Sequence, residues 1–525
     1  MRTRALGAIM MAIGLLCSLG LAQPRNADQW YAAGRRALQN RQYAAAEQAF
    51  EEAVKRNPTA ANWRWLGEAR VGLESYDGAT TAFGSAILKY RASGDTLTAN
   101  ALENRVAPYR QQGDFYRLNQ PILRPRSLAR LEPTAGLMLG SYVDERGIDA
   151  GGNLVIPDRL GAGLAVYFRY HKLIDPAQVT QNQTVFPSRL AAAVQRVGGA
   201  LHIALEPSMP LEQVTERIVT PFALAVRDSR IPVFVRFASE FNDPSQPWSK
   251  NPPLYKEKFR LVASLLHRIA PNAATVWMPM ASRFEVLDSY YPGAEFVDWA
   301  GVSLYSTPFS NGDRNQSNSR VSPLDILEKF YAKYADRHPI QVSEYAASNE
   351  TLLTPNIDYS AFATQKMRML YWGAFLRLPR LKNINWLDLD MIRTRYLPPG
   401  RAAERRNNYA LYDNPAKFEV FRSLLSEPYF VRDSLIEASA APSPMPAVLK
   451  ARPAGFEIAA WVKTYDPNVA RVRYSLDGLD FAVASVLPYR AKLPALRVGQ
   501  RLLTLRAFNA SGKLLLTRSI RLEIR

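Results

Sequence analysis

The sequence contains very few of the side chains that build metal and redox sites. Its 525 residues include one cysteine, Cys17, and four histidines. The cysteine lies inside a leader-like N-terminal stretch, so a chain cleaved after that stretch would contain none. Disulfides, thiolate metal ligands and a cysteine nucleophile are then excluded. The histidines are too scattered for a zinc site, and we expect neither a metal nor a cofactor. They are His171, His202, His267 and His338.

Long apolar runs are also missing beyond the N-terminus. There, Arg2 and Arg4 precede an apolar centre at residues 9–16 and a small-residue exit at residues 20–22. This order predicts that residues 1–22 form a secretory signal peptide. An uncleaved anchor helix is the alternative, although the apolar run is short for a bilayer span. We therefore expect an exported bacterial protein, periplasmic, envelope-bound or extracellular, with no transmembrane span in its mature chain.

Basic runs with interleaved aromatic residues are absent, although the formal net charge is +19. The arginines are spread along the chain, so no nucleic-acid partner is expected. Binding to an acidic polysaccharide or to the cell envelope would explain the positive charge. A general bias of the proteome toward arginine would explain it equally well. Charge alone does not select a substrate. The contents of 47% hydrophobic and 22% charged residues are typical of folded globular domains.

Residues 27–115 contain an internal repeat with a spacing of 33 residues. The first copy has Trp30, Ala33, Gly34, Tyr43, Ala46, Phe50 and Ala53, and the second has Trp63, Leu66, Gly67, Tyr76, Ala79, Phe83 and Ala86. The pattern resembles the tetratricopeptide repeat, in which small residues let paired helices approach and aromatic residues fill the space between them. The resemblance implies a helical array that binds a protein partner. A passive spacer is the alternative.

Residues 121–430 alternate apolar runs with amphipathic helical patterns, which predicts a parallel α/β sheet. Eight strands over this length favour a (β/α)₈ TIM barrel. No glycine-rich dinucleotide loop follows the first strand, which argues against an open nucleotide-binding sheet. The expected strands are 136–143, 163–170, 199–205, 232–238, 275–278, 297–305, 339–343 and 384–389.

The sequence pattern changes after the barrel region, from residue 437 onward. Residues 437–448 are rich in proline, alanine and serine and predict a linker. Residues 449–525 contain short alternating strands, with a tight turn at Asp477-Gly478 and a hairpin loop at residues 509–512. They resemble the Ig-like β-sandwich modules appended to bacterial surface enzymes. Such a module serves either as a packing or spacer domain of the enzyme, or as a carbohydrate-binding domain.

Two glutamates end predicted strands of the barrel. Glu240 follows the run that begins at Pro232, and Glu344 ends the run that begins at Pro339. The carboxyl ends of barrel strands form the catalytic face. A retaining glycosidase needs two carboxyl groups there, roughly 5–5.5 Å apart. The pair therefore predicts sugar chemistry.

The motifs around these glutamates resemble glycoside hydrolase family 26. They are Pro232-Val-Phe-Val-Arg-Phe-Ala-Ser-Glu240, Trp248, the segment from Tyr291 to Tyr305, Pro339-Ile-Gln-Val-Ser-Glu344 and Asn385-Trp386. The resemblance implies a retaining, endo-acting enzyme with catalytic glutamates after strands four and seven. By position, Glu240 matches the acid/base and Glu344 the nucleophile.

Six further residues are candidates for substrate binding. Because side chains alternate along a strand, Arg236 is expected on the same side as Glu240, where it is suited to holding a carboxylate ionised. The resemblance places Tyr305 near the nucleophile and Trp386 beneath the reacting sugar, and Trp248 would flank the cleft. Buried tryptophans are often only core, so a packing role stays open for both. The full set is Arg236, Ser239, Asn242, Trp248, Tyr305 and Trp386.

Ser239 departs from the family pattern, because family 26 usually has a histidine immediately before the acid/base. Serine is too short to make the same substrate contact. Either the substrate differs from mannan or the site is weakened. We predict an exported retaining hydrolase of a β-linked polysaccharide, mannan-like or an envelope exopolysaccharide. The alternative is a non-catalytic polysaccharide-binding or assembly protein whose repeats recruit partners.

Overall fold

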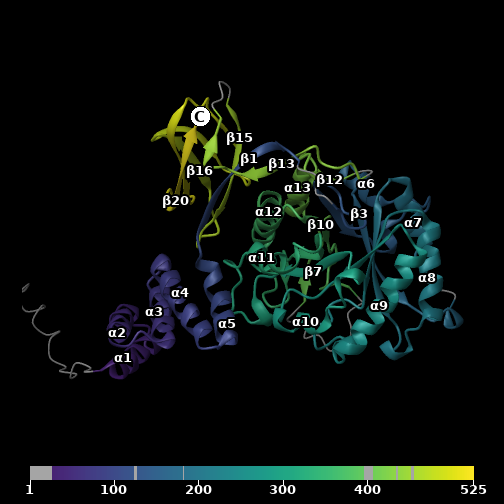
Figure 1. The fold of residues 1–525 in the computed structure, drawn as a ribbon, viewed down its shortest axis with the longest axis horizontal. Coiled ribbons are helices and arrows are strands. Elements are labelled where there is room, and N and C mark those ends of the chain that lie inside the picture. The colour runs from purple at the N-terminus through teal and green to yellow at the C-terminus, as the bar shows by residue number, and fades with distance from the viewer. Residues whose placement is uncertain (1–25, 123–126, 181–182, 395–405, 433–434, 451–454) are drawn as a thin grey trace, which may run out of the picture. The chain divides into compact units, whose positions relative to one another are not determined.

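The computed structural model describes residues 26–525 with five internal gaps, and the chain divides into two compact units, Met1–Arg110 and Gln111–Arg525 (Figure 1). The gaps are residues 123–126, 181–182, 395–405, 433–434 and 451–454. The expected signal segment, residues 1–22, lies outside the described residues. Among the helices that are described, none combines the length and apolar character needed to cross a membrane.

The first unit consists of helices whose packing explains the repeat. Its α-helices are α1 (Ala27–Gln39), α2 (Tyr43–Arg56), α3 (Ala60–Gly72), α4 (Tyr76–Ala92) and α5 (Thr96–Val106). A Cβ added at Gly34 would lie 2.8 Å from the buried Phe50 ring, and one added at Gly67 would lie 2.7 Å from Phe83. In each helix pair, the aromatic ring of the second helix thus packs against the glycine of the first, where no side chain stands in its way. The tetratricopeptide identity of these helices stays a prediction.

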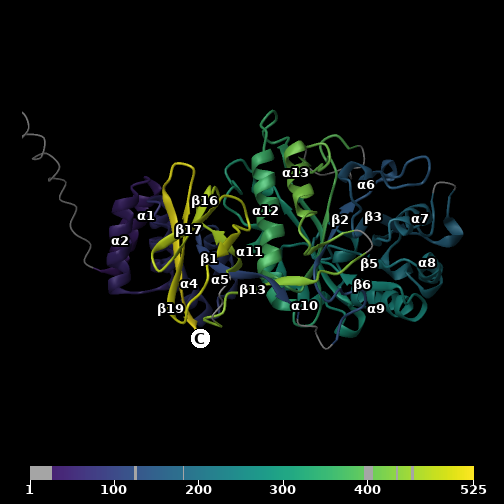
Figure 2. The ribbon, with the colours of Figure 1, turned by 90° about the horizontal axis from the view of Figure 1, so that it is seen from above.

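Eight parallel strands of the second unit close into a barrel (Figure 2). Each strand pairs with the next in chain order, and the last pairs with the first. The strands are β2 (Leu137–Tyr142), β3 (Val166–Leu173), β4 (Ala200–Pro207), β5 (Val233–Phe237), β6 (Ala273–Trp277), β7 (Trp299–Ser306), β8 (Ile340–Ala347) and β10 (Leu381–Trp386). These are the eight predicted strands, so the (β/α)₈ barrel is confirmed.

A helix follows each barrel strand in the chain. These helices are α6 (Val155–Leu160), α7 (Ser188–Arg196), α8 (Glu216–Ser229), α9 (Pro252–Ile269), α10 (Leu287–Tyr290), α11 (Pro323–Tyr334), α12 (Ser360–Arg377) and α13 (Pro415–Leu424). Every residue of β5, β6, β8 and β10 is buried. Strands covered on both faces read as nearly continuous apolar runs, which is why the sequence revealed them.

The C-terminal strands form two sheets with a shared apolar core. One sheet has β13 (Ala440–Pro444), β1 (Gln112–Pro121), β15 (Phe456–Lys463) and β18 (Ala491–Leu493), and the other has β14 (Val448–Leu449), β20 (Leu514–Ile524), β19 (Gly499–Phe508), β16 (Arg471–Leu476) and β17 (Leu479–Ala484). Ile458 and Tyr474, one from each sheet, are buried in this core. Asp477 and Gly478 both have positive φ in the turn between β16 and β17, as hairpin turns require. The Ig-like identity of the two sheets stays a prediction.

This sheet pair takes strands from both sides of the barrel sequence. Strand β1 precedes the barrel and pairs with β15 and β13. The segment expected as a linker, residues 437–448, contains β13, whose backbone is paired. Its Pro/Ala/Ser composition resembles that of a linker, but an edge strand tolerates proline as well. Trp461 of β15 joins the barrel's hydrophobic core, and Lys463 pairs with Asp325 of α11.

We predict that Gly67→Ala destabilises the first unit by about 1–3 kcal/mol, because the added methyl group would overpack the Phe83 ring. The matched control is Gly84→Ala in α4, where a Cβ would meet nothing within 4 Å. There the higher helix propensity of alanine predicts a gain of roughly 0.5–1 kcal/mol. Hydrogen exchange of α3 and α4 in the full chain measures both changes. Equal exchange in the two variants would contradict the packing argument.

Candidate active site

Glu240 lies just beyond the end of β5, in a backbone turn that residues other than glycine rarely adopt. Ala238 and Glu240 have φ values of 45° and 57°, and each such residue costs about 1–2 kcal/mol. The main-chain N–H of Glu240 donates to the carbonyl of Met278 at 2.8 Å, which ties the turn to the end of β6. The hydroxyl of Ser303, from β7, donates to Oε1 of Glu240 at 2.5 Å. The surrounding strands thus hold the carboxyl group in a strained turn, as functional sites often do.

Glu344 lies inside β8 and is 4% exposed. The hydroxyls of Tyr170, from β3, and Tyr305, from β7, donate to its Oε1, and the guanidinium of Arg236, from β5, pairs with its Oε2. Burial and the charge of Glu344 raise the pKa of each tyrosine well above the usual value for this side chain, so both hydroxyls remain donors. Two donors and a cation therefore engage both oxygens of this buried carboxyl group.

The two glutamates belong to one electrostatic cluster at the C-terminal end of the barrel. Ser303 and Glu344 are register partners on β7 and β8, and the hydroxyl of Ser303 reaches Glu240. After burial, the charges of both glutamates contribute to the raised pKa of Tyr170 and of Tyr305. Strands four and seven of the barrel therefore deliver their carboxyl groups to the same group of side chains.

Arg236 is the buried cation of this cluster. Its side chain is completely covered, Nη1 lies 2.8 Å from the sulfur of Met278, and the guanidinium lies 4.6 Å from the ring centre of Phe168. Burial alone would lower the pKa of Arg236, but the charge of Glu344 raises it overall, so the guanidinium stays charged. The sequence placed Arg236 on the side of Glu240, and the structure pairs it with Glu344.

Tyr170 and Ser303 are contacts of the glutamates that the sequence analysis did not single out. Tyr170 is the last residue of the strand expected at 163–170, so it stands at the same end of the barrel as Glu240 and Glu344. Ser303 lies two residues before Tyr305 on one strand, and alternation places both on one face. Alternation from Tyr305 would have found Ser303, and the expected strand end would have found Tyr170, although β3 runs on to Leu173.

Three of the predicted substrate-binding residues support the loops around Glu240. The indole N–H of Trp248, a residue that is 7% exposed, donates to the carbonyl of Ser239 at 2.8 Å. The amide of Asn242 donates to the carbonyls of Met280 and Ser282 at 2.9 and 2.6 Å. These bonds join the loops after β5 and β6. In this structure the polar groups of Trp248 and Asn242 are engaged with backbone rather than open to a cleft.

Trp386 differs most from its expected role as a floor beneath the sugar. It is 0% exposed, its N–H donates to the carbonyl of Tyr409 at 3.0 Å, and its ring meets that of Tyr345 edge to face. The ammonium of Lys417 lies 5.6 Å from its ring centre. Because these groups surround it, Trp386 forms part of the wall and presents no open face.

The barrel interior near the pair is polar. Asn385 donates from its side chain to the carbonyl of Ser343 at 3.3 Å and lies 2.6 Å from Nδ1 of His202. Burial, and then the charge of Arg236, hold the pKa of His202 well below its ordinary value, so the imidazole is neutral. Across the described ranges, no group of three or more histidine, cysteine, aspartate or glutamate side chains is arranged to hold a metal ion.

No protein family and no curated protein matches the chain. Several solved structures resemble it weakly. A family 26 endo-β-1,4-mannanase from Cellulomonas fimi is 14% identical, over 74% of this chain and 94% of that one, with a TM-score of 0.39. A Podospora anserina GH26-CBM35 β-(1,4)-mannanase is 13% identical over 59% and 70%, with a TM-score of 0.37. A Bacteroides uniformis β-glucuronidase is 12% identical over 71% and 43%, with a TM-score of 0.34. We draw no conclusion from likenesses this weak.

We predict that Tyr170→Phe lowers the free energy of unfolding by about 1.5–3 kcal/mol, because it removes a hydrogen bond to the buried Glu344 carboxylate. Tyr371→Phe is the matched control. Among the described residues, the hydroxyl of buried Tyr371 has no hydrogen-bond partner, so its removal should change stability by at most about 0.5 kcal/mol. Urea unfolding of the two variants measures the difference. Equal effects would show that the Tyr170 contact adds nothing to stability.

Proposed function

We propose that this protein is a retaining glycoside hydrolase acting on a β-linked polysaccharide, with Glu344 as nucleophile and Glu240 as acid/base. One observation carries the proposal. Glu344 is held by one cation and two hydroxyl donors, while Glu240, on the strained turn after β5, accepts from the hydroxyl of Ser303 on β7. Two carboxyl groups in such different surroundings suit two different roles.

The chemistry follows from these surroundings. Glu240 donates its proton to the glycosidic oxygen as the bond to the anomeric carbon breaks, and Glu344 attacks that carbon to form a glycosyl-enzyme ester. Glu240, now ionised, takes a proton from water, which attacks the anomeric carbon and releases Glu344. Arg236, Tyr170 and Tyr305 orient the nucleophile before the first step, and they bind its released carboxylate again after the second.

The substrate class is the less specific part of the proposal. A mannan-like chain or an envelope exopolysaccharide fits the resemblance to family 26, and endo action fits it as well. Ser239 replaces the histidine that this family usually carries, and its carbonyl is fixed by Trp248. We therefore expect a substrate whose recognition does not depend on an imidazole next to the acid/base. Export through residues 1–22 and partner binding by the helical repeats belong to the same proposal.

Glu344→Gln should abolish hydrolysis of both polysaccharides and aryl β-glycosides, because no nucleophile remains. Glu240→Gln should abolish polysaccharide hydrolysis, since general acid catalysis contributes about 10²–10⁴-fold. It should keep the first step on aryl glycosides with acidic phenol leaving groups, which need no proton. The burst of released phenol in stopped-flow mixing separates the two variants. Glu216→Gln, a surface change in α8, is the control and should be fully active.

Retention is tested on the wild-type enzyme by proton NMR, in which the first product formed must carry the β-anomer. A first product with the α-anomer, or unchanged activity of either glutamine variant, would refute the assignment. Tight glycan binding without turnover on mannans, xylans, mixed-linkage glucans and acidic exopolysaccharides would favour the non-catalytic alternative.

A further inference from the structure

Strand β8 contains a β-bulge at the residues just before and at Glu344. Between Val342 and Glu344, its register with β7 shifts by one residue. Its register with β10 shifts over the same stretch, between Val342 and Tyr345. Among the described pairs of both registers, Ser343 has no partner. An extra residue of this kind interrupts the alternation of a strand and changes the direction of the side chains that follow.

Two consecutive side chains of β8 face the barrel interior at this bulge. Gly301 and Tyr305 share one face of β7 by alternation. A Cβ added at Gly301 would overlap Oγ of Ser343, and the hydroxyl of Tyr305 donates to Glu344. Neighbouring residues of a regular strand would point to opposite faces. Tyr345, the next residue, faces outward and meets a tyrosine ring of α12.

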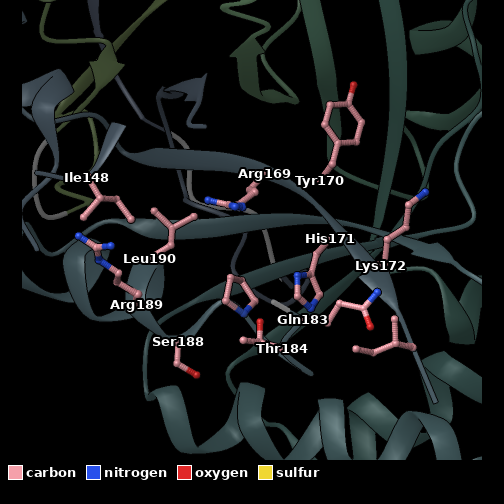
Figure 3. Close-up of a pocket in the computed structure, with 12 residues that line it drawn as sticks. Ile148, Arg169, Tyr170, His171, Lys172, Gln183, Thr184, Ser188, Arg189 and Leu190 are labelled. Carbon is pink, nitrogen blue, oxygen red and sulfur yellow. The ribbon is translucent and has the colours of Figure 1, made fainter. Parts of the chain in front are cut away.

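The contacts of Glu344 depend on this orientation. Figure 3 shows the side chain of Tyr170, on β3, pointing away from the other labelled residues, and its hydroxyl reaches Glu344. Arg236 pairs with Glu344 from β5. Without the extra residue in β8, the carboxyl group of Glu344 would turn outward toward the helices, away from both partners. The bulge therefore delivers the proposed nucleophile to the site.

Asn385 of β10 lies opposite the bulge and contacts it. Its Nδ2 donates to the carbonyl of Ser343 at 3.3 Å and lies 2.6 Å from Nδ1 of His202. A second amide, that of Asn383, donates to Oδ1 of Asn385 at 3.1 Å, which fixes the end of the Asn385 amide that faces the bulge. The register partner of Asn385 on β2 is Gly140, where an added Cβ would overlap Oδ1. Glycine thus leaves the space through which Asn385 reaches His202 on β4.

His202 supplies the acceptor that orients Asn385. Burial, and then the charge of Arg236, hold the pKa of His202 well below its ordinary value, so the ring is neutral. Because Nδ1 accepts from the amide of Asn385, the single ring proton is on Nε2. Asn385, His202 and Ser343 are all fully buried, so water does not compete for these bonds.

We infer that Asn385 and His202 are positioning residues, which hold the bulge of β8 and thereby aim the carboxyl group of Glu344. Their effect on a reaction rests on the proposed function, whereas their effect on the position of Glu344 does not. Neither residue touches the reacting atoms. Their loss should displace the carboxyl group and slow its attack on the anomeric carbon, with little change in substrate affinity.

Two variants break the contact from either side. His202→Phe keeps a ring beside the rings of Phe168 and Phe234 but has no acceptor, and Asn385→Leu keeps a branched shape but has no donor. We expect each to lower the saturating burst rate with dinitrophenyl β-mannobioside by about tenfold or more, because a small displacement of a reacting group is costly. The half-saturating concentration should stay unchanged. His202→Asn, whose Oδ1 can accept in place of Nδ1, should recover most of the lost rate.

Asn272→Leu is the matched control. Asn272 precedes β6 at the opposite end of the barrel, and its amide donates to the carbonyls of Val226 and Ile231, both at 2.8 Å. Like Asn385→Leu, this variant removes an amide that donates two hydrogen bonds, so it should lose stability but keep the wild-type burst rate. Circular dichroism and melting temperature verify that each variant folds.

Two further measurements need no activity. In crystal structures, the Glu344 carboxyl group of His202→Phe should be displaced from its wild-type position. In wild-type protein with its four histidines labelled with nitrogen-15, NMR should show the proton of His202 on Nε2 alone. An unmoved carboxyl group, a proton on Nδ1, or an unchanged burst rate in both variants overturns the inference. A wild type without turnover would refute the proposed function instead, and the crystal structures would then decide whether the pair holds the bulge.

Discussion

The ion pair between Arg236 and Glu344 is the interaction on which the candidate site depends. Both groups are almost completely buried, and an isolated charge in that position would carry a large desolvation penalty. The penalty is offset because the carboxylate also accepts from two tyrosine hydroxyls and because the guanidinium lies over the Phe168 ring. A charge pair of this kind contributes little to stability by itself, but removing one partner would leave the other uncompensated.

The closed barrel makes this arrangement possible. Residues from β3, β5, β7 and β8 meet at Glu344, and their sequence positions span 170 to 344. In an open sheet, strands this far apart in order would not converge on one carboxylate. Closure through the pairing of β10 with β2 brings the strand ends around a common axis. Within the closed sheet, the hydroxyl of Ser303 on β7 reaches Glu240, and Ser303 pairs in register with Glu344 of β8, so the proposed acid/base and nucleophile share a rigid frame.

Periodicity in the sequence determined the helical repeat, the eight barrel strands and the two strand-end glutamates. Helix and strand patterns are local, and buried parallel strands leave continuous apolar runs. Strand β1 could not be assigned to the C-terminal sheet, because its pairing partners lie more than 300 residues away. The exposure of Trp386 and Trp248 was equally undetermined, because the sequence around a tryptophan does not show whether the side chain is packed in the barrel wall or lines a cleft. Only the tertiary structure decided that Arg236 pairs with Glu344 and that Tyr170 joins them, because closure of the barrel, and no local pattern, sets which side chains from distant strands meet.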